Sequence, residues 1–234
     1  MDLKGKKILI TGGSLGIGKA TAKLLVEKGA QVAITGRTGI RLSEAAKETG
    51  AFPIVADVSE EADVKRSFDL FLDEFGKIDV LINNAGIGIR KNVDELKPDH
   101  FQKIFDVNVV GASMMAAVAA KHFKQQKSGS LINIGSTAGL KGYPGGSVYV
   151  ASKFALRGLT ECWRAELRPF NVRVMLINPS EVTTAFGNPE RKERAEIKNK
   201  LRPLEIAHAI VSGLEMDERG FVPELSVWAT NPFD

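Results

Sequence analysis

The sequence predicts an α/β fold in which a single doubly wound parallel sheet is flanked by helices on both faces. Short runs rich in β-branched residues alternate with longer segments of helical period, and this alternation is the pattern of repeated βαβ units. Parallel strands joined in this way are covered by helices on both faces of the sheet. The chain has 234 residues, 44% of them hydrophobic, which is enough for one core. We therefore expect a single domain over residues 1–234.

Strands and helices are expected to alternate along the chain. The expected strands are Lys7 to Thr11, Gln31 to Thr35, Phe52 to Ala56, Val80 to Asn83, Ser130 to Gly135, Arg173 to Asn178 and Gly220 to Pro223. The expected helices are Gly16 to Lys28, Ile40 to Thr49, Glu60 to Phe75, Pro98 to Lys124, Ser147 to Arg168 and Pro203 to Met216. A further, strongly charged helix is expected near Pro189 to Lys200.

Composition and charge argue against several classes of function. The formal net charge is +4, but 32 Lys and Arg residues are interleaved with 28 Asp and Glu residues, so we do not expect nucleic-acid binding. Cys162 is the only cysteine, which rules out an intrachain disulfide and a four-cysteine zinc site. The histidines lack the spacing of metal ligands, so no metal site is expected; they are His100, His122 and His208.

No segment of the sequence is typical of export or of a membrane span. The first residues lead into a short apolar strand without a signal-length apolar stretch. The longest apolar run, Val107 to Ala120, is interrupted by polar and small residues and is shorter than the roughly 20 apolar residues that a spanning helix needs. We therefore expect a cytoplasmic protein without a membrane partner.

A glycine-rich turn lies between the first expected strand and the helix that follows it. The segment Thr11 to Gly18 reads TGGSLGIG. Glycines in such a turn let the backbone approach a pyrophosphate, whose charge meets free N–H groups and the positive end of the helix dipole. In this position the motif favours a Rossmann-type dinucleotide site over an ordinary flexible turn. The cofactor residues expected here are Gly12, Ser14, Gly16, Ile17 and Gly18.

The residues after the second expected strand bear on which dinucleotide is bound. An NAD-specific site usually has an acidic residue about 20 residues past the glycine turn, whereas this chain has Thr35-Gly36-Arg37. A guanidinium can hold a 2′-phosphate through paired, charge-assisted hydrogen bonds. We therefore expect NADP(H) to be preferred over NAD(H). Arg37 could instead be a solvated residue before the next helix, and Arg41 could take either role.

Polar and small residues end the third and fourth expected strands. Asp57 follows the third strand, and Asn83-Asn84-Ala85-Gly86 ends the fourth. Both groups lie at carboxyl ends of strands, the edge at which open α/β sheets bind ligands. Asp57 taken alone is more typical of a cap for the helix that follows it.

A tyrosine and a lysine lie four residues apart in the helix Ser147 to Arg168. This spacing places Tyr149 and Lys153 on the same helix face. An ammonium ~4 Å from a phenol contributes on the order of 4 kcal/mol at an effective dielectric of about 20, enough to lower a tyrosine pKa of ~10 by ~3 units. The pair is a candidate proton donor and acceptor, although an isolated pair of this kind is more often a solvated surface feature. Tyr143 is the weaker candidate because Ser147, four residues later, supplies no charge.

Two further polar residues are candidates for the same site. Ser136 follows the strand Ser130 to Gly135, where its hydroxyl could bond a substrate carbonyl, and Thr137 is the alternative. Asn108 lies in an otherwise apolar helix, and it either bends the helix or takes part in a proton relay to solvent.

In their order and spacing, these motifs resemble the short-chain dehydrogenase/reductase family over nearly the whole chain. The resemblance is carried by the turn Thr11 to Gly18, the segment Asn83 to Gly86, Asn108, Ser136 and Tyr149-x-x-x-Lys153. It implies hydride transfer between a nicotinamide cofactor and a small-molecule carbonyl or alcohol. Members commonly form dimers and tetramers through the two long helices, so a homodimer or homotetramer is expected.

The resemblance also implies a role for each matching residue. Tyr149 would donate or accept the proton, and Ser136 would orient the carbonyl. Lys153 would bind the nicotinamide ribose and lower the tyrosine pKa, and Asn108 would join a water relay. Asp57 and Val58 would lie beside the adenine, Asn83 near its ribose and Val182 against the carboxamide. The implied cofactor residues beyond the glycine turn and Arg37 are Asp57, Val58, Asn83, Ala85, Gly86, Tyr149, Lys153, Pro179 and Val182.

The sequence departs from the family pattern at two places. Pro179-Ser180-Glu181-Val182 stands where many members have Pro-Gly, and the chain lacks the Gly-Gly tail of many 3-oxoacyl-[acyl-carrier-protein] reductases. Such a reductase is the alternative function within the family. The alternative from another class is a protein that senses the dinucleotide without turnover.

Substrate choice is expected to depend on segments that follow strand ends. These segments are Gly88 to Lys91, Leu140 to Gly146 and Thr183 to Leu201, with residues 183–202 covering the substrate as a mobile lid. The basic residues of the last segment could attract an acidic acyl-thioester carrier or a coenzyme phosphate, or form a solvated face. They are Arg191, Lys192, Arg194, Lys198 and Lys200.

Overall fold

Seven parallel strands form the centre of the protein in the computed structural model, which describes residues 1–188 and 190–232. Their order in the sheet is β3-β2-β1-β4-β5-β6-β7, and each neighbouring pair is parallel. The predicted doubly wound sheet is therefore confirmed. The strands are β1 (Lys7–Ile10), β2 (Gln31–Gly36), β3 (Phe52–Val55), β4 (Val80–Asn83), β5 (Gly129–Ile134), β6 (Val172–Pro179) and β7 (Glu224–Val227).

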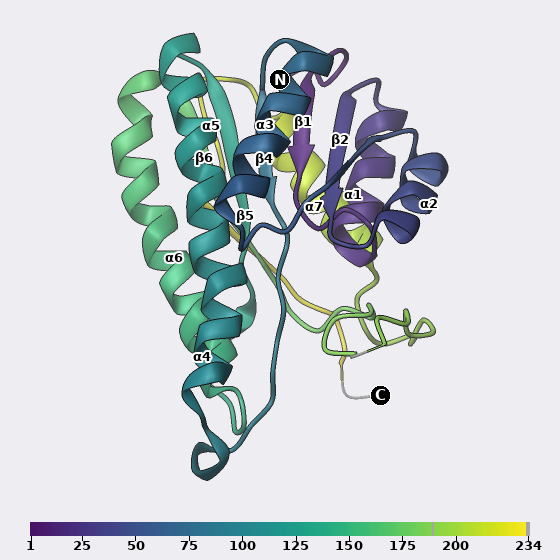
Figure 1. Cartoon of the computed structure of the whole chain (residues 1–234), viewed down its shortest axis with the longest axis vertical. Helices are drawn as coiled ribbons and strands as arrows, with labels where there is room; N and C mark the ends of the chain where they lie inside the picture. Colours follow the sequence, from purple (N-terminus) through teal and green to yellow (C-terminus); the bar gives the residue numbers. More distant parts are fainter. Residues whose placement is uncertain (189, 233–234) are drawn as a thin grey trace.

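Two layers of helices cover the sheet because successive strand residues point to opposite faces. Ile8 and Ile10 belong to one buried cluster and Leu9, between them, to the other. Helices α1 (Gly16–Glu27), α2 (Gly39–Thr49) and α7 (Pro203–Glu215) pack on the first face. Helices α3 (Glu61–Phe75), α5 (Ala112–Gln126) and α6 (Ser147–Leu167) pack on the second (Figure 1).

The predicted helix Pro98 to Lys124 is continuous but contains an irregular turn. It consists of α4 (Pro98–Phe105), a π-helical turn at Asp106–Gly111 and α5. An 18-residue window of the stretch Pro98–Gln126 has a mean hydropathy of 1.4, so by length and composition alone this stretch could cross a membrane. Met115, Ala119 and Phe123 are buried in the core cluster on the second face of the sheet, so the inward-facing apolar residues of α5 belong to the core.

Two predictions for the last third of the chain were wrong. The final strand lies at Glu224–Val227 rather than Gly220 to Pro223, because Leu225 and Val227 are the residues that pack on the first core cluster. The charged helix near Pro189 to Lys200 is absent from the described residues, since 190–200 form coil and turns, and Pro189 lies outside them. Residues 190–200 offer little apolar surface to bury, and Ile197 is 48% exposed.

Candidate active site

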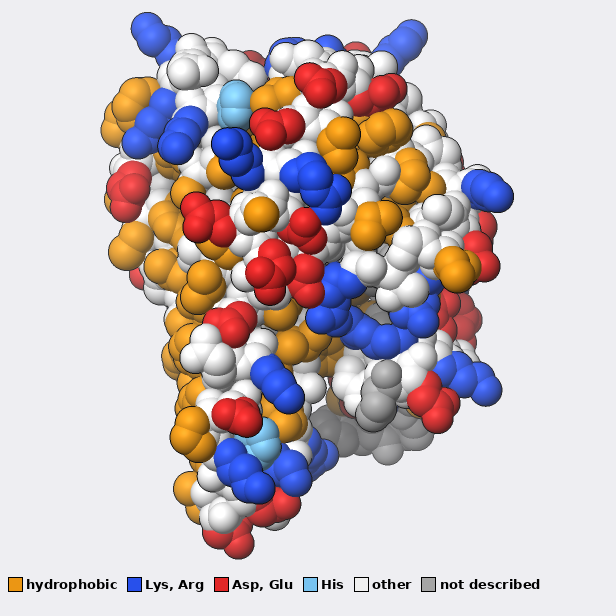
Figure 2. Space-filling model, viewed as in Figure 1, with side chains coloured by type: hydrophobic (Ala, Val, Ile, Leu, Met, Phe, Trp, Pro, Cys, Tyr) orange, Lys and Arg blue, Asp and Glu red, His pale blue; other side chains and the backbone are white. Residues whose placement is uncertain are grey.

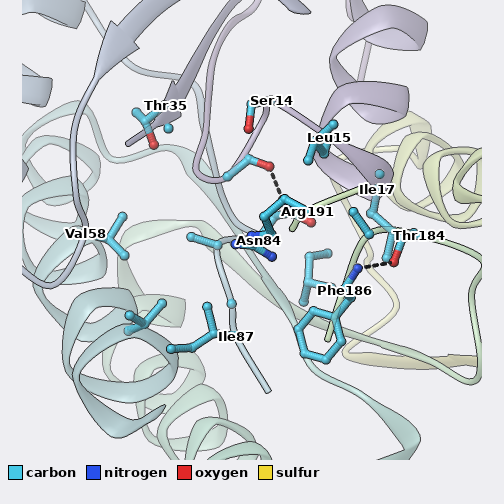
Figure 3. A pocket seen from close by; sticks show the side chains of 18 of the residues that line it. Ser14, Leu15, Ile17, Thr35, Val58, Asn84, Ile87, Thr184, Phe186 and Arg191 are labelled. Atoms are coloured by element: carbon cyan, nitrogen blue, oxygen red, sulfur yellow. Dashed lines mark hydrogen bonds between the residues drawn. The ribbon is translucent and has the colours of Figure 1, made fainter. Parts of the chain in front are cut away.

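A cavity of about 290 Å³ lies at the carboxyl ends of the central strands (Figure 3). The chain order reverses between β1 and β4, and ligands of open α/β sheets bind at such a switch point. Most of the predicted site residues line this pocket. They are Gly12, Ser14, Gly16, Ile17, Arg37, Asp57, Val58, Ala85, Gly86, Ser136, Tyr149, Lys153, Pro179 and Val182.

The glycine turn has a backbone that only glycine adopts readily. Gly12 and Gly16 have φ angles of 67° and 53°, in the left-handed region that disfavours a side chain. A Cβ atom on Gly12 would lie 2.8 Å from Ala85 Cα. Gly18 does not line the pocket; a Cβ there would lie 2.5 Å from the Gly12 carbonyl oxygen, so this glycine permits close packing of helix on turn.

An anionic group of the chain itself occupies the start of α1. The Glu193 carboxylate accepts a hydrogen bond from the Gly16 N–H at 3.0 Å. Free N–H groups and the helix dipole attract negative charge at this position. The turn therefore fits the phosphates of a dinucleotide, both in the shape of its backbone and in the kind of group that it holds.

The two asparagines that end β4 have different roles. The side chain of Asn84 donates to the carbonyl oxygens of Thr11 and Gly12 and so supports the glycine turn. Asn83 points away from the pocket, where its side chain donates to Ala112 O and Asn133 Oδ1 in the core. The Asn83 side chain therefore takes the core-facing side of the strand and does not line the pocket, so its place near the cofactor ribose stays a prediction that only its backbone could fulfil.

Charged residues line the part of the pocket that follows β2 and β3. Arg37 forms a long ion pair with Asp57 at 3.4 Å, and 52% of its side chain is exposed. Arg41 lines the same pocket from α2. Arg191 adds a third guanidinium from the segment that follows β6; of the five basic residues that the sequence indicated in this segment, it is the one that lines the pocket.

Ser136, Tyr149 and Lys153 form one wall of the pocket, which we call the α6 wall. Ser136 Oγ accepts a hydrogen bond from Ala138 N–H at 3.1 Å, and the Ser136 side chain is close enough to Tyr149 to lower the pKa of the tyrosine. Lys153 Nζ is buried and donates to the Ile134 carbonyl oxygen at 2.8 Å. Thr137 starts a 3₁₀ turn behind Ser136 and does not line the pocket, and Tyr143 is 45% exposed outside it. The geometry thus favours Ser136 over Thr137 and Tyr149 over Tyr143.

The pKa of Tyr149 in the α6 wall differs from the expectation. Burial raises the pKa of Tyr149 to about 12, partly offset by the Ser136 side chain nearby. Burial also lowers the pKa of Lys153 to about 8. The expected lowering of the tyrosine pKa by lysine does not appear: burial is the largest effect on the pKa of Tyr149, and Lys153 Nζ donates to a carbonyl oxygen instead.

Asn108 lies behind the pocket in the π-helical turn and does not line it. Its side chain accepts from Ile87 N–H and donates to Ile87 O, at 2.9 Å each. It also donates to Ser152 Oγ at 3.0 Å, within the helix that carries Tyr149. Through these contacts Asn108 links α6 to the loop that follows β4. Asn108 itself lies in the irregular, π-helical turn.

Residues 183–202, of which 189 lies outside the described residues, form what we call the covering segment. It follows β6 and lies below α1 in Figure 1, and its residues Thr184, Ala185, Phe186 and Arg191 line the pocket. Its base is closed by pairing of Val182 with Leu201, and Thr183 N–H donates to Leu201 O at 2.8 Å. Phe186 packs on the Tyr149 ring with centroids 5.4 Å apart. Figure 3 shows its N–H bonded to Thr184 Oγ1. The sequence indicated this segment but not Phe186.

The residues at the end of β6, which differ from the Pro-Gly of many family members, still pair with β7. Ser180 N–H donates to Val227 O at 2.9 Å, so β7 holds the backbone directly beyond Pro179. Pro179, Ser180 and Val182 all line the pocket. The departure from Pro-Gly therefore leaves this edge of the site in place.

Comparisons with known proteins agree in family and fold. The sequence profile of the short chain dehydrogenase family matches residues 6–195. An uncharacterized oxidoreductase of Listeria monocytogenes is 39% identical over 191 residues, covering 79% of this chain and 77% of that protein. A 3-ketoacyl-(acyl-carrier-protein) reductase from Brucella melitensis, solved in complex with NADH, shares 30% identity with a TM-score of 0.89, over 99% of this chain and 100% of that one. An alcohol dehydrogenase of Thermococcus sibiricus, complexed with 5-hydroxy-NADP, shares 30% identity with a TM-score of 0.87, over 96% and 97%.

Proposed function

The chain belongs to the short-chain dehydrogenase family, and on that premise we propose that it is an NADP(H)-dependent reductase of small carbonyl compounds or dehydrogenase of the matching alcohols. The observation that carries the proposal is that Ser136, Tyr149 and Lys153 line the same pocket as the glycine turn. A proton donor and a dinucleotide cradle in one cavity are what this reaction needs.

Each group of the α6 wall has a task in this reaction. Bound in the pocket, the nicotinamide would supply or accept the hydride. Tyr149 keeps its proton at neutral pH because its pKa is raised to about 12, so it is ready to protonate a carbonyl oxygen. Ser136 lines the same pocket and would orient the same oxygen. Lys153 is buried close behind and would bond the nicotinamide ribose.

The preference for NADP(H) is supported by the arginines of the pocket. Arg37 and Arg41 follow β2, where an NAD-specific site usually has a carboxylate. The carboxylate present, Asp57, already faces Arg37. A 2′-phosphate would add a stronger partner for these guanidiniums.

The proposal is tested by cofactor titration followed by turnover. NADPH and NADH are titrated separately by fluorescence, and absorbance at the nicotinamide band is then followed with a panel of ketones, aldehydes, diketones and acetoacetyl thioesters. We expect tighter binding of NADPH and turnover of at least one carbonyl class. Binding without turnover on any of them would favour a dinucleotide sensor, and tighter binding of NADH would overturn the role of Arg37.

A second candidate is reduction of acyl thioesters held on an acidic carrier protein. The exposed basic residues of the covering segment favour it, since Arg194 and Lys198 are exposed on the segment that contributes Phe186 and Arg191 to the pocket. The structural neighbour from Brucella melitensis is named for that reaction. Faster turnover of a carrier-bound 3-oxoacyl thioester than of the same acyl group on a small thiol would support it.

We also propose that two or four copies associate through the α4–α6 side. Figure 2 shows hydrophobic side chains along the edge of the molecule formed by these helices. Phe101, Val110 and Phe154 are large apolar residues there, each 39–45% exposed. Exposed apolar surface of this kind is typical of subunit interfaces. Light scattering at several concentrations tests the proposal, and a monomer at all of them would contradict it.

A further inference from the structure

Arg191 brings a third positive charge to the part of the pocket that holds Arg37 and Arg41. It comes from the covering segment, far from the other two in sequence, and lines the same cavity. Figure 3 shows its side chain inside the pocket, between Ser14 and Phe186. The three guanidiniums are close enough that Arg37 and Arg41 lower the pKa of Arg191, in addition to the effect of its burial. Like charges gather in this way where an anion is to be bound.

The carboxylates nearby do not balance these charges. Asp57 is the only carboxylate among the described residues that line the pocket, and it faces Arg37 at 3.4 Å. In the part of the chain that the structure describes, neither Arg41 nor Arg191 forms an ion pair. The Glu193 carboxylate at the Gly16 N–H is a second negative charge close by, and with both carboxylates counted the three guanidiniums still leave a net positive charge, which a phosphate monoester would balance.

The backbone holds Arg191 in an uncommon conformation. Its φ angle is 55°, in the region that side chains other than glycine rarely adopt. Asn188 fixes this turn: its carbonyl accepts from Arg191 N–H at 3.0 Å, and its side chain bonds Glu190 N–H and Lys192 O. A strained backbone that several hydrogen bonds hold in place is typical of positions where the direction of the side chain is important for function.

We propose that Arg191 binds the 2′-phosphate of NADP(H), together with Arg37 and Arg41, so that the covering segment itself selects the cofactor. The inference rests on the proposed function. Phe186 of the same segment packs on Tyr149, so the contact with the phosphate also holds the segment over the reacting groups. NAD(H) lacks that phosphate and would bind without this contact.

The test compares two cofactors on three proteins: wild type, Arg191→Ala and Lys192→Ala. Lys192 is exposed on the same segment and does not line the pocket, so its substitution removes an equal charge as a matched control. We expect Arg191→Ala to weaken NADPH binding by about 10- to 50-fold, as for loss of a charged hydrogen bond, and NADH binding by less than about threefold. Lys192→Ala should change either by less than about twofold.

Proteolysis gives a second readout, because the segment contains several trypsin sites besides Arg191. Saturating NADP⁺ should protect residues 192–200 of the wild type better than saturating NAD⁺, and Arg191→Ala should abolish that difference. The inference would be overturned if Arg191→Ala weakened the binding of NADPH and of NADH equally, or weakened neither. If the wild type binds NADH as tightly as NADPH, the proposed function fails as well; if it prefers NADPH and Arg191→Ala keeps that preference, only the inference fails.

Discussion

The α6 wall and the covering segment enclose one pocket but are held in different ways. Tyr149 and Lys153 lie in a regular helix, and Lys153 is bonded to the neighbouring strand β5. The covering segment has no regular helix or strand between residues 183 and 200 in its described part. Its position depends on single contacts such as Phe186 with Tyr149 and Glu193 with Gly16. We thus assign proton transfer to the α6 wall, which is held by a regular helix, and cofactor selection to the covering segment, which is held by fewer contacts.

The largest effect is expected where the rigid wall meets the substrate. Tyr149→Phe removes the proposed proton donor and should lower kcat by about 1000-fold, within the range for general acid catalysis. NADPH affinity should stay within about threefold, because the aromatic ring remains. Tyr143→Phe is the matched control and should retain nearly full activity, since Tyr143 lies outside the pocket. Equal losses for the two variants would contradict the assignment.

A stability measurement tests the burial of Lys153. Its pKa is about 8 in the folded protein and 10.5 in the reference state, so between these values the unfolded chain binds more protons. The free energy of unfolding should therefore rise with pH across this window, by about 3 kcal/mol from this group. Lys153→Met should lack this rise. The check is denaturant unfolding of both proteins at pH 7 and pH 10; parallel pH curves would show that the ammonium is not desolvated.

Asn108 tests how the rigid wall is held. Asn108→Ala leaves the Ile87 N–H and Ser152 hydroxyl without their buried partner, which should reduce the free energy of unfolding by about 2–3 kcal/mol. Gln102→Ala, on an exposed part of the preceding helix, should cost less than about 0.5 kcal/mol. Urea denaturation measures both. A loss for Asn108→Ala no greater than for Gln102→Ala would show that this link does not stabilise the wall.

The smallest effect is expected at the covering segment, and with the opposite sign. Glu193→Ala removes the carboxylate that holds the Gly16 N–H, a group that a pyrophosphate would also need. Affinity for NADPH and NADH should rise alike, by about three- to tenfold. Glu190→Ala removes the same charge nearby and should leave both affinities within about twofold. Weaker binding after Glu193→Ala would mean that this carboxylate supports the site.

Local patterns were enough to predict most of the sheet and the α6 wall. The glycine turn depends on a strand, a turn and a helix that adjoin in sequence, and the Tyr149–Lys153 pair depends on one helical turn. The side chain of Asn83 faces the core and not the pocket, and the alternation of side chains along β4 was enough to predict this. Asn83 has the same parity as Leu81, which faces the core under α5, so the next residue, Asn84, turns to the pocket.

The covering segment shows where such patterns stop being informative. Its charged residues suggested a helix, but a helix with no apolar face gains nothing from docking. Arg191 and Glu193 reach the pocket through the path of an irregular loop, which depends on distant partners in α1 and α2. Side chains placed in this way have no sequence period, so the sequence could indicate Arg191 only as one of five basic residues and did not indicate Glu193 at all.

The pairing of Val182 with Leu201 gives the covering segment a modular character. The chain leaves the sheet edge at one of these residues and returns at the other, with Thr183 N–H bonded across the junction. Loops whose ends meet tolerate changes in length at small entropic cost. Loops of other lengths and sequences can therefore be grafted between Thr183 and Lys200 onto an unchanged sheet, so the pocket can be refitted to new substrates while its proton chemistry stays the same.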